Sequence, residues 1–225
     1  SMTWKTGRTS IWHCATRSET QARMDLPAAT PLPLILQPDA FSDPDWLFEV
    51  KHDGFRSLAC IQDGCKLVSR KGNTYQRFKD LSKVLSGVPH DVVLDGELVC
   101  LDDEGQTLFY DLMFNRAPAS FYAFDILWLD GEDLREKLTQ ERKEILQGVV
   151  SESPQRLLYV DHIEEEGEQL FELICKRDME GIVAKPKESP YRELRGKTPW
   201  IKIKNPDYSQ AEGRGELFHP SSEAK

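Results

Sequence analysis

The stretch that decides the fold is WLFEVKHDGFRSLACI, residues 46–61, in which two apolar segments flank four polar or small residues. Both segments are rich in the aromatic and branched residues of strands. The Asp-Gly pair at 63–64 predicts a tight turn into a third strand, CKLVSR, at 65–70. Because a buried charge is costly unless it is paired or functional, Lys51 is either a paired structural lysine or a reactive one.

The bulk composition is that of an ordinary globular protein. The chain has 225 residues, of which 39% are hydrophobic and 30% charged, and no apolar run is long enough to span a bilayer. Its five cysteines are scattered and include no C-x-x-C pair, which favours a reducing, cytoplasmic location over a disulfide framework or a zinc site. Residues 1–26 are polar and aperiodic and lack the apolar core of a secretory signal, so they are predicted to form a loose arm.

Charge is unevenly distributed along the chain. The net charge of −9 argues by itself against a nucleic-acid partner. Residues 185–204, however, form a basic segment with only two acids, and its cations are Lys185, Lys187, Arg192, Arg195, Lys197, Lys202 and Lys204. Tyr191 and Trp200 are interleaved with them, a pattern that suits a nucleic-acid backbone and also a solvated loop.

Hydrophobic periodicity predicts an α+β domain over residues 27–208, with mostly antiparallel sheets flanked by helices and a polar tail at 209–225. The expected strands are 46–51, 55–62, 65–70, 91–101, 121–131, 156–163, 180–185 and 200–204. The expected helices are 74–87, 133–150 and 166–179. The apolar face of the second helix would consist of Leu134, Leu138, Ile145 and Leu146.

Charged residues recur at strand positions, and strand ends in one sheet tend to converge. A cleft that mixes cations with carboxylates suits an anionic substrate with a divalent metal. The residues concerned are Glu49, Lys51, Asp53, Arg56, Arg70, Asp95, Glu97, Asp125, Glu180, Lys185, Lys202 and Lys204.

Six short motifs carry a resemblance to a known family. They are KHDG (51–54), SRKGN (69–73), LDGELV (94–99), FYAFDIL (121–127), EGIVAK (180–185) and WIKIK (200–204). Their order and spacing resemble those of covalent nucleotidyltransferases, and the flanking residues are most similar to the adenylation domain of bacterial ATP-dependent DNA ligases of the end-joining type. The resemblance covers roughly residues 32–216 and implies an ATP-grasp-like nucleotidyltransferase fold.

The resemblance implies that Lys51 attacks the α-phosphate of ATP and becomes a lysyl–AMP adduct. An ordinary lysine is protonated near neutrality and therefore inert, so nearby cations must lower its pKa. Lys202 and Lys204 are the family's candidates, and alternation with Ile201 and Ile203 places them on one strand face. Without the other motifs, lysines that guard an edge strand are the better explanation of the pattern.

The resemblance also implies a nucleotide-binding set. Glu97 would bind the ribose hydroxyls, Phe124 would stack on adenine, Lys185 would contact phosphate and Glu49 would lie near the adenine edge. From the residues alone, Glu97 is a solvent-facing strand residue and Phe124 is a core aromatic. Gly96 favours the functional interpretation, because glycine within a strand often marks a close approach.

The remaining implied positions concern phosphates and metal. Arg56 and Arg70 would meet ribose, phosphate or the 5′-phosphate of a nicked strand, although either is also compatible with a surface ion pair. Asp53 and Glu180 would hold Mg²⁺ or Mn²⁺ or orient the nucleophile. Sparse protein ligation is expected, since Mg²⁺ takes one or two carboxylates and keeps several waters.

The sequence departs from the family after Lys204. DNA ligases usually continue into an OB-fold, which needs five strands, and the residues after 204 cannot supply them. Three explanations are expected for the missing OB-fold: the sequence is truncated, the protein is a natural minimal transferase, or a separate protein supplies the domain. The expected substrate is nicked or broken double-stranded DNA, and no membrane partner is expected. RNA ligation or capping-type transfer, and a non-catalytic nucleotide- or DNA-binding module that recruits end-joining partners, are the alternatives.

Overall fold

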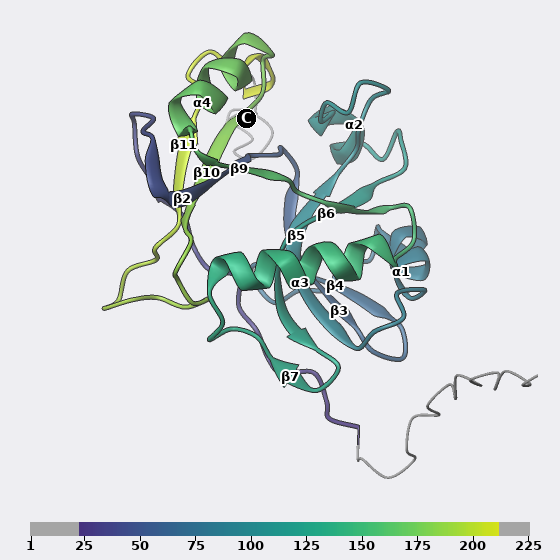
Figure 1. Cartoon of the computed structure of the whole chain (residues 1–225). Coiled ribbons are helices and arrows are strands. Elements are labelled where there is room, and N and C mark those ends of the chain that lie inside the picture. Colours follow the sequence, from purple (N-terminus) through teal and green to yellow (C-terminus); the bar gives the residue numbers. More distant parts are fainter. Residues whose placement is uncertain (1–22, 212–225) are drawn as a thin grey trace, which may run out of the picture.

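The computed structural model describes residues 23–211, which form two β-sheets and four α-helices (Figure 1). Sheet A has the strand order β1-β11-β10-β2-β9, made of β1 Ile35–Leu36, β11 Ile201–Lys204, β10 Gly181–Pro186, β2 Asp43–Val50 and β9 His162–Glu165. Sheet B has the order β4-β3-β5-β6-β7, made of β4 Cys65–Ser69, β3 Phe55–Ile61, β5 Val92–Val99, β6 Ser120–Leu129 and β7 Glu132–Asp133. A sixth strand, β8 Leu157–Tyr159, pairs with β6.

Strand pairing in the described residues is antiparallel except for β1 with β11 and β6 with β8. The predicted α+β class with mostly antiparallel sheets is therefore confirmed. The predicted turn at 63–64 is also confirmed, because Asp63 and Gly64 both have positive φ and join β3 to β4.

The motif KHDG is the connection between the two sheets. β2 belongs to sheet A and β3 to sheet B, so residues 51–54 carry the chain across. Gly54 lies against sheet B, where a Cβ would stand 2.0 Å from the carbonyl oxygen of Leu98. A glycine is needed for this approach. Lys51 thereby stands where the sheets meet, and its amide donates to the carbonyl of Gly181 in β10 at 2.9 Å.

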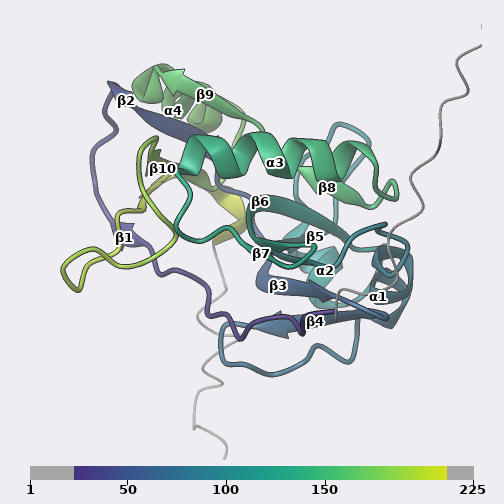
Figure 2. The same ribbon diagram turned by 60° about the horizontal axis from the view of Figure 1, so that its bottom comes forward.

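The helices cover the outer faces of the sheets (Figures 1 and 2). The short helix α1 (Lys79–Leu85) buries Leu81 and Leu85, while α3 (Thr139–Ser151) buries Leu146 and Val149 against sheet B. The helix α4 (Gly167–Lys176) packs Ile174 onto sheet A. The sequence prediction did not include α2 (Phe109–Met113) or the 3₁₀ turn η1 (Ser209–Ala211).

The predicted helix at 133–150 begins six residues too early. Residues 132–133 pair with β6 as β7, and the helix starts at Thr139. Its buried face includes Arg142 and Lys143. Leu134 and Leu138 of the predicted apolar face therefore precede the helix, and two cations are part of the buried face of α3.

The single strand predicted at 156–163 is also wrong. It consists of two strands, β8 in sheet B and β9 in sheet A, so the chain crosses between the sheets a second time near Val160. Val160 is buried, and its amide donates to the carbonyl of Ala123 at 2.9 Å. An apolar pattern of eight residues cannot show such a change of sheet.

The two chain ends extend beyond the described residues. Residues 1–22 of the predicted arm and 212–225 of the predicted tail lie outside them. Arg23, just inside, donates to Asp91 and Asp63 on sheet B, and Gln210 in η1 donates to the carbonyl of Thr107 at 3.0 Å. None of the helices in residues 23–211 is both long and apolar enough to cross a bilayer.

Candidate active site

A cavity lies where the two sheets meet, with about 420 Å³ of atom-free space that is partly open to solvent. This is within the range of ligand pockets. Six of the predicted site residues line it, namely Glu49, Lys51, Arg56, Glu97, Phe124 and Lys185. The predicted convergence of charged strand residues on a common cleft holds for five of them, namely Glu49, Lys51, Arg56, Glu97 and Lys185.

Lys51 is paired, and it also faces the cavity. Its Nζ lies 2.6 Å from Glu180 Oε2, and both side chains are mostly buried. Glu180 lies just before β10 and does not line the cavity itself. The pairing and the cavity-lining position are compatible, because a carboxylate beside an amine can accept its proton.

The two lysines of β11 lie outside the cavity wall. Lys204 is 52% exposed and its Nζ lies 3.8 Å from Glu180 Oε1. The pKa of Lys202 is lowered by burial and by the positive charges of Lys204, Lys51 and Arg70. Lys51 therefore stands in a cluster of cations, as the pattern of alternating lysines predicts.

Glu97 is held on β5 beside Gly96. A Cβ on Gly96 would stand 2.4 Å from both a ring carbon of Phe121 and the carbonyl oxygen of Tyr122, so only glycine lets β5 and β6 pack here. Burial raises the pKa of Glu97 to about 8, against the opposing effects of Lys51 and Arg56, and the charge of Glu180 adds to the rise. A pKa of about 8 favours the protonated form of Glu97 at neutral pH.

This proton gives a stability prediction with a definite sign. Between the ordinary value of 4.5 and about 8, folded Glu97 binds a proton that the unfolded chain releases, so stability falls as pH rises through this window. Glu97→Gln should make the free energy of unfolding fall less steeply with pH, by at most about 1.4 kcal/mol per pH unit. Urea unfolding from pH 5 to 9 measures it, with Glu144→Gln on α3 as the control. An unchanged slope in Glu97→Gln would contradict the prediction.

Glu49 is the centre of a buried ionic triad at the cavity wall. It is 2% exposed, and its two carboxylate oxygens each lie 2.7 Å from a lysine Nζ, one of Lys143 and one of Lys185. Lys143 also donates to the carbonyl of Val160 at 2.6 Å, and Lys185 to that of Phe124 at 3.1 Å. Burial lowers the pKa of Lys185, while Glu49 opposes the shift.

Two residues, Asp95 and Tyr191, hold Arg56 in place. The sequence prediction did not assign this role to either of them. Asp95 Oδ1 and Oδ2 accept from its guanidinium at 3.0 and 2.6 Å. The Tyr191 hydroxyl donates to Asp95 at 2.5 Å and accepts from the amide of Leu32 at 2.9 Å. This chain fixes Arg56 against the cavity, 5.1 Å from the Phe124 ring centroid.

Aromatic residues form the apolar part of the wall. Phe124 lies edge to face with Trp200 at 6.2 Å, and the Lys185 ammonium lies 4.2 Å from the Trp200 centroid. His52 stacks on Tyr122 at 4.2 Å and 15°, and burial lowers its pKa to about 4, which leaves it neutral at pH 7. Sequence reasoning assigned no role to His52 in the site and assigned Trp200 to the basic surface.

Two predicted site residues lie elsewhere. Arg70 is exposed after β4 and does not line the cavity. Asp53 is 3% exposed and accepts a hydrogen bond from the Tyr208 hydroxyl at 2.8 Å. The residues that the structure describes contain no group of three or more His, Cys, Asp or Glu side chains placed to hold a metal ion.

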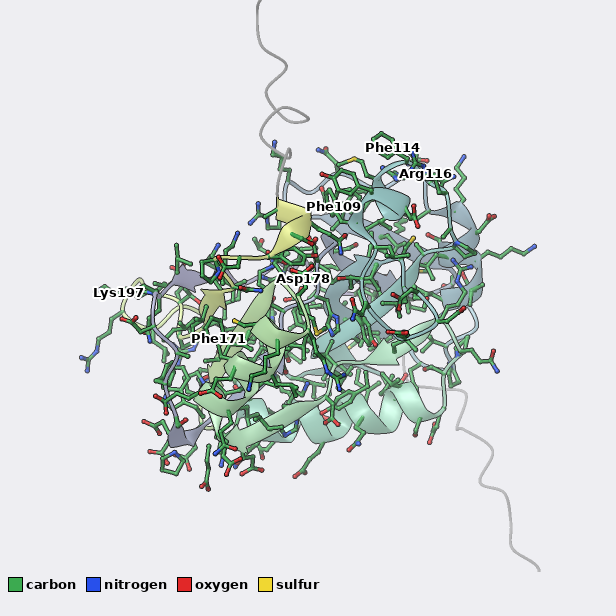
Figure 3. The ribbon with its side chains drawn as sticks, turned by 90° about the horizontal axis from the view of Figure 1, so that it is seen from above. Phe109, Phe114, Arg116, Phe171, Asp178 and Lys197 are labelled. Carbon is green, nitrogen blue, oxygen red and sulfur yellow. The ribbon has the colours of Figure 1, made fainter. Side chains whose placement is uncertain are left out.

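Only part of the basic segment 185–204 lies on the surface of the protein. Lys185, Tyr191 and Trp200 are buried, so they cannot contact a nucleic-acid backbone as the sequence suggested. Lys187 lies 2.5 Å from Glu164, and Arg192 lies 3.2 Å from Glu136. Within residues 23–211, Arg195 and Lys197 are the cations of the 185–199 stretch that are exposed and outside any ion pair (Figure 3 labels Lys197).

The sequence is similar to bacterial end-joining proteins. It is 37% identical over 167 residues to the multifunctional non-homologous end joining protein LigD of Mycolicibacterium smegmatis, over 71% of this chain and 21% of the relative. It is 33% identical over 192 residues to the protein of that name from Pseudomonas aeruginosa, over 78% of this chain and 22% of the relative. The chain thus spans about a fifth of these relatives.

The structure is similar to a solved ligase. Mycobacterial DNA ligase D complexed with ATP and MES superposes with a TM-score of 0.69 and 30% identity, over 78% of this chain and 60% of that one. The pattern of the family described as ATP dependent DNA ligase domain matches residues 35–204, which include every predicted site residue. The chain therefore belongs to the ATP-dependent DNA ligase domain family.

Proposed function

We propose that residues 27–208 form an adenylation domain that loads AMP from ATP onto Lys51 and transfers it to the 5′-phosphate of nicked DNA. The observation that carries this proposal is the position of the Lys51 side chain. It points into a cavity lined by a carboxylate, a guanidinium and an aromatic ring, Glu97, Arg56 and Phe124, and has a carboxylate 2.6 Å away.

The first step joins Lys51 Nζ to the α-phosphorus. Neutral Nζ attacks, the bond from phosphorus to the pyrophosphate oxygen breaks, and pyrophosphate leaves with that electron pair. The amine proton must leave Nζ, and Glu180 Oε2 is the nearest acceptor. The cations Lys202 and Lys204 would attract the phosphates.

The other cavity residues would bind the nucleoside. We propose that Phe124 stacks on adenine, that Glu97 accepts from the ribose hydroxyls as its proton leaves, and that Glu49 lies near the adenine edge. Arg56, fixed by Asp95, would meet the ribose or phosphate. Lys185 is already bonded to Glu49 and to the Phe124 carbonyl, so we propose that it acts chiefly by holding them.

We propose that a divalent ion binds beside the cavity. The charge of Glu180 adds to the raised pKa of Glu97, and a cation would offset that charge. Mg²⁺ or Mn²⁺ would be held by Glu180, with Asp53 orienting the loop through Tyr208, and sparse protein ligation suits Mg²⁺. When bound, the ion neutralises phosphate charge.

The direct test is intact mass after incubation with Mg²⁺ and either ATP or GTP. We expect one added AMP with ATP, mapped to the peptide containing Lys51, and no GMP adduct. Transfer is then measured with a nicked duplex that carries a 5′-phosphate, and sealing of that nick by gel. A GMP adduct would favour the capping-type alternative, and no adduct at all would contradict the proposal.

Cations outside the cavity would meet the DNA backbone. Arg195→Gln with Lys197→Gln should lower the slope of log K against log salt by about 1.8, because each phosphate contact contributes about 0.9. Fluorescence anisotropy with a nicked duplex measures the slope. Lys66→Gln with Lys176→Gln, two exposed lysines elsewhere, should leave it unchanged. Equal effects of the two pairs would exclude a specific contact.

Further contacts with the nucleotide and the duplex would come from outside residues 27–208. Another part of the same protein or a separate protein could supply them, since the relatives are much longer than this chain. We propose a cytoplasmic location for the reaction, where ATP and chromosomal DNA meet.

A further inference from the structure

A second cavity lies between α1 and the segment that follows α2, and it shares no lining residue with the active-site cavity. Its walls come from α1, from the residues just before it, from the segment after α2, and from Arg156, and it holds about 730 Å³ of atom-free space that is partly open to solvent. Figures 1 and 2 both place α1 and α2 on the side of the molecule away from α4 and sheet A.

The two cavities lie on opposite faces of β3. Neighbouring residues of a strand point to opposite faces, and Phe55 and Arg56 are neighbours. Arg56 lines the active-site cavity, whereas the Phe55 ring lies 5.5 Å from the guanidinium carbon of Arg77, which lines the second cavity. A nucleotide bound at Lys51 therefore cannot also fill the second cavity.

The second cavity is cationic in a protein of net charge −9. Three arginines and one acid line it, Arg77, Arg116 and Arg156 with Asp80, which gives a formal balance of 3 − 1 = +2. No ion pair joins Arg77 or Arg156 to a carboxylate within residues 23–211, and Arg116 lies 3.9 Å from Asp111. The cationic charge is thus poorly compensated by the protein.

Neutral groups hold two of these arginines in place. Arg77 donates to the carbonyls of Leu112 and Met113, and its guanidinium carbon lies 4.9 Å from the Phe78 ring centroid. Arg156 donates to the carbonyl of Ala119 at 2.8 Å. Carbonyls and rings orient a guanidinium without neutralising its positive charge. The remaining N–H groups are therefore pre-organised for an anion such as phosphate.

An exposed aromatic ring adjoins the cations. Phe114 is 51% exposed, and the guanidinium carbon of Arg116 lies 4.9 Å from its centroid. Tyr110 is stacked against it at 6.5 Å and 11°. Figure 3 shows Phe114 and Arg116 close together, far from Phe171 and Lys197. A cation next to a half-exposed aromatic ring matches a phosphate next to a base or sugar.

We propose that this cavity binds a backbone phosphate of a polynucleotide strand, with the adjoining base or sugar against Phe114. The proposal rests on the proposed function for its choice of polymer, since a free nucleotide has the same chemistry. It adds a contact for DNA that is separate from the nucleotide cavity and from Arg195 and Lys197.

The test is the rate at which phenylglyoxal modifies Arg116 in the wild-type chain, read by peptide mass. Nicked duplex DNA should slow it at least about 3-fold, while ATP and inorganic phosphate at equal phosphate concentration should not. Equal protection by either small anion would make the cavity a free-anion site and overturn the polynucleotide assignment. No protection by any of the three would overturn the site.

A binding measurement gives the second readout. Arg116→Gln should lower the salt slope of duplex binding by about 0.9, while Lys83→Gln, an exposed lysine of α1 outside the cavity, should not. Phe114→Ala should weaken binding about 5-fold or more, within the range for one stacked base. AMP loading of the wild type separates the hypotheses: loading without Arg116 protection contradicts only this inference, and protection without loading contradicts only the proposed function.

Discussion

Replacing Lys51 by alanine should abolish AMP loading, with a loss of at least about 1000-fold in the rate of adduct formation. No other lysine lines the cavity except Lys185, which is 1% exposed and bonded to Glu49 and the Phe124 carbonyl. The measurement is intact mass after incubation with ATP and Mg²⁺. An adduct that persists in Lys51→Ala would exclude Lys51 as the attachment site.

Lys51→Arg is the matched control for the ion pair. An arginine keeps a cation opposite Glu180, but its guanidinium stays protonated and cannot attack phosphorus. We expect no adduct from this variant, with a free energy of unfolding within about 1 kcal/mol of the wild type. A loss of loading with normal stability would separate the chemical role of Lys51 from its structural role in pairing with Glu180.

Replacing Arg142 by methionine should destabilise the fold by about 3–5 kcal/mol, because it leaves Asp125 buried without its charge partner. Arg142 is 0% exposed and donates to both Asp125 oxygens, at 2.7 and 2.9 Å. Burial would raise the pKa of Asp125, but Arg142 and Lys185 hold it below its usual value. Urea unfolding at pH 7 measures the loss.

A surface pair of the same chemistry is the control. Arg135 and Asp133 also form a two-pronged pair, at 2.9 and 2.6 Å, but their side chains are 34% and 43% exposed. Arg135→Met should therefore cost less than about 1 kcal/mol. Asp125→Asn added to Arg142→Met should recover part of the loss, since the orphaned charge is gone. A small effect of Arg142→Met alone would show that water reaches Asp125.

Much of the active site follows from residue types along the chain. The turn at 63–64, the strands on either side of KHDG and the glycine inside β5 are local features, and local sterics determine them. Charged residues within apolar strands signalled the cavity, because such charges need partners or a function. Of the eleven predicted site residues, five charged ones line the cavity, and Phe124, predicted only from the family resemblance, is the sixth.

The missed residues depend on contacts between distant segments. Arg142 and Lys143 stand at helical spacing from Leu146, but charge on a helix normally marks its solvent face. Their partners Asp125 and Glu49 come from different sheets. A pattern of cations on the apolar face of a predicted helix is the signal that could have identified them.

The sequence by itself determined the family and the α+β class and predicted Lys51 as the central residue, since short motifs and period-two patterns are local properties of the chain. Only the tertiary structure decided which charges share a cavity, which are buried supports and which are exposed to solvent. The physical reason is that pairing and burial depend on how two sheets and α3 meet. Lys185, Tyr191 and Trp200 belong to one basic segment, and packing turns all three inward.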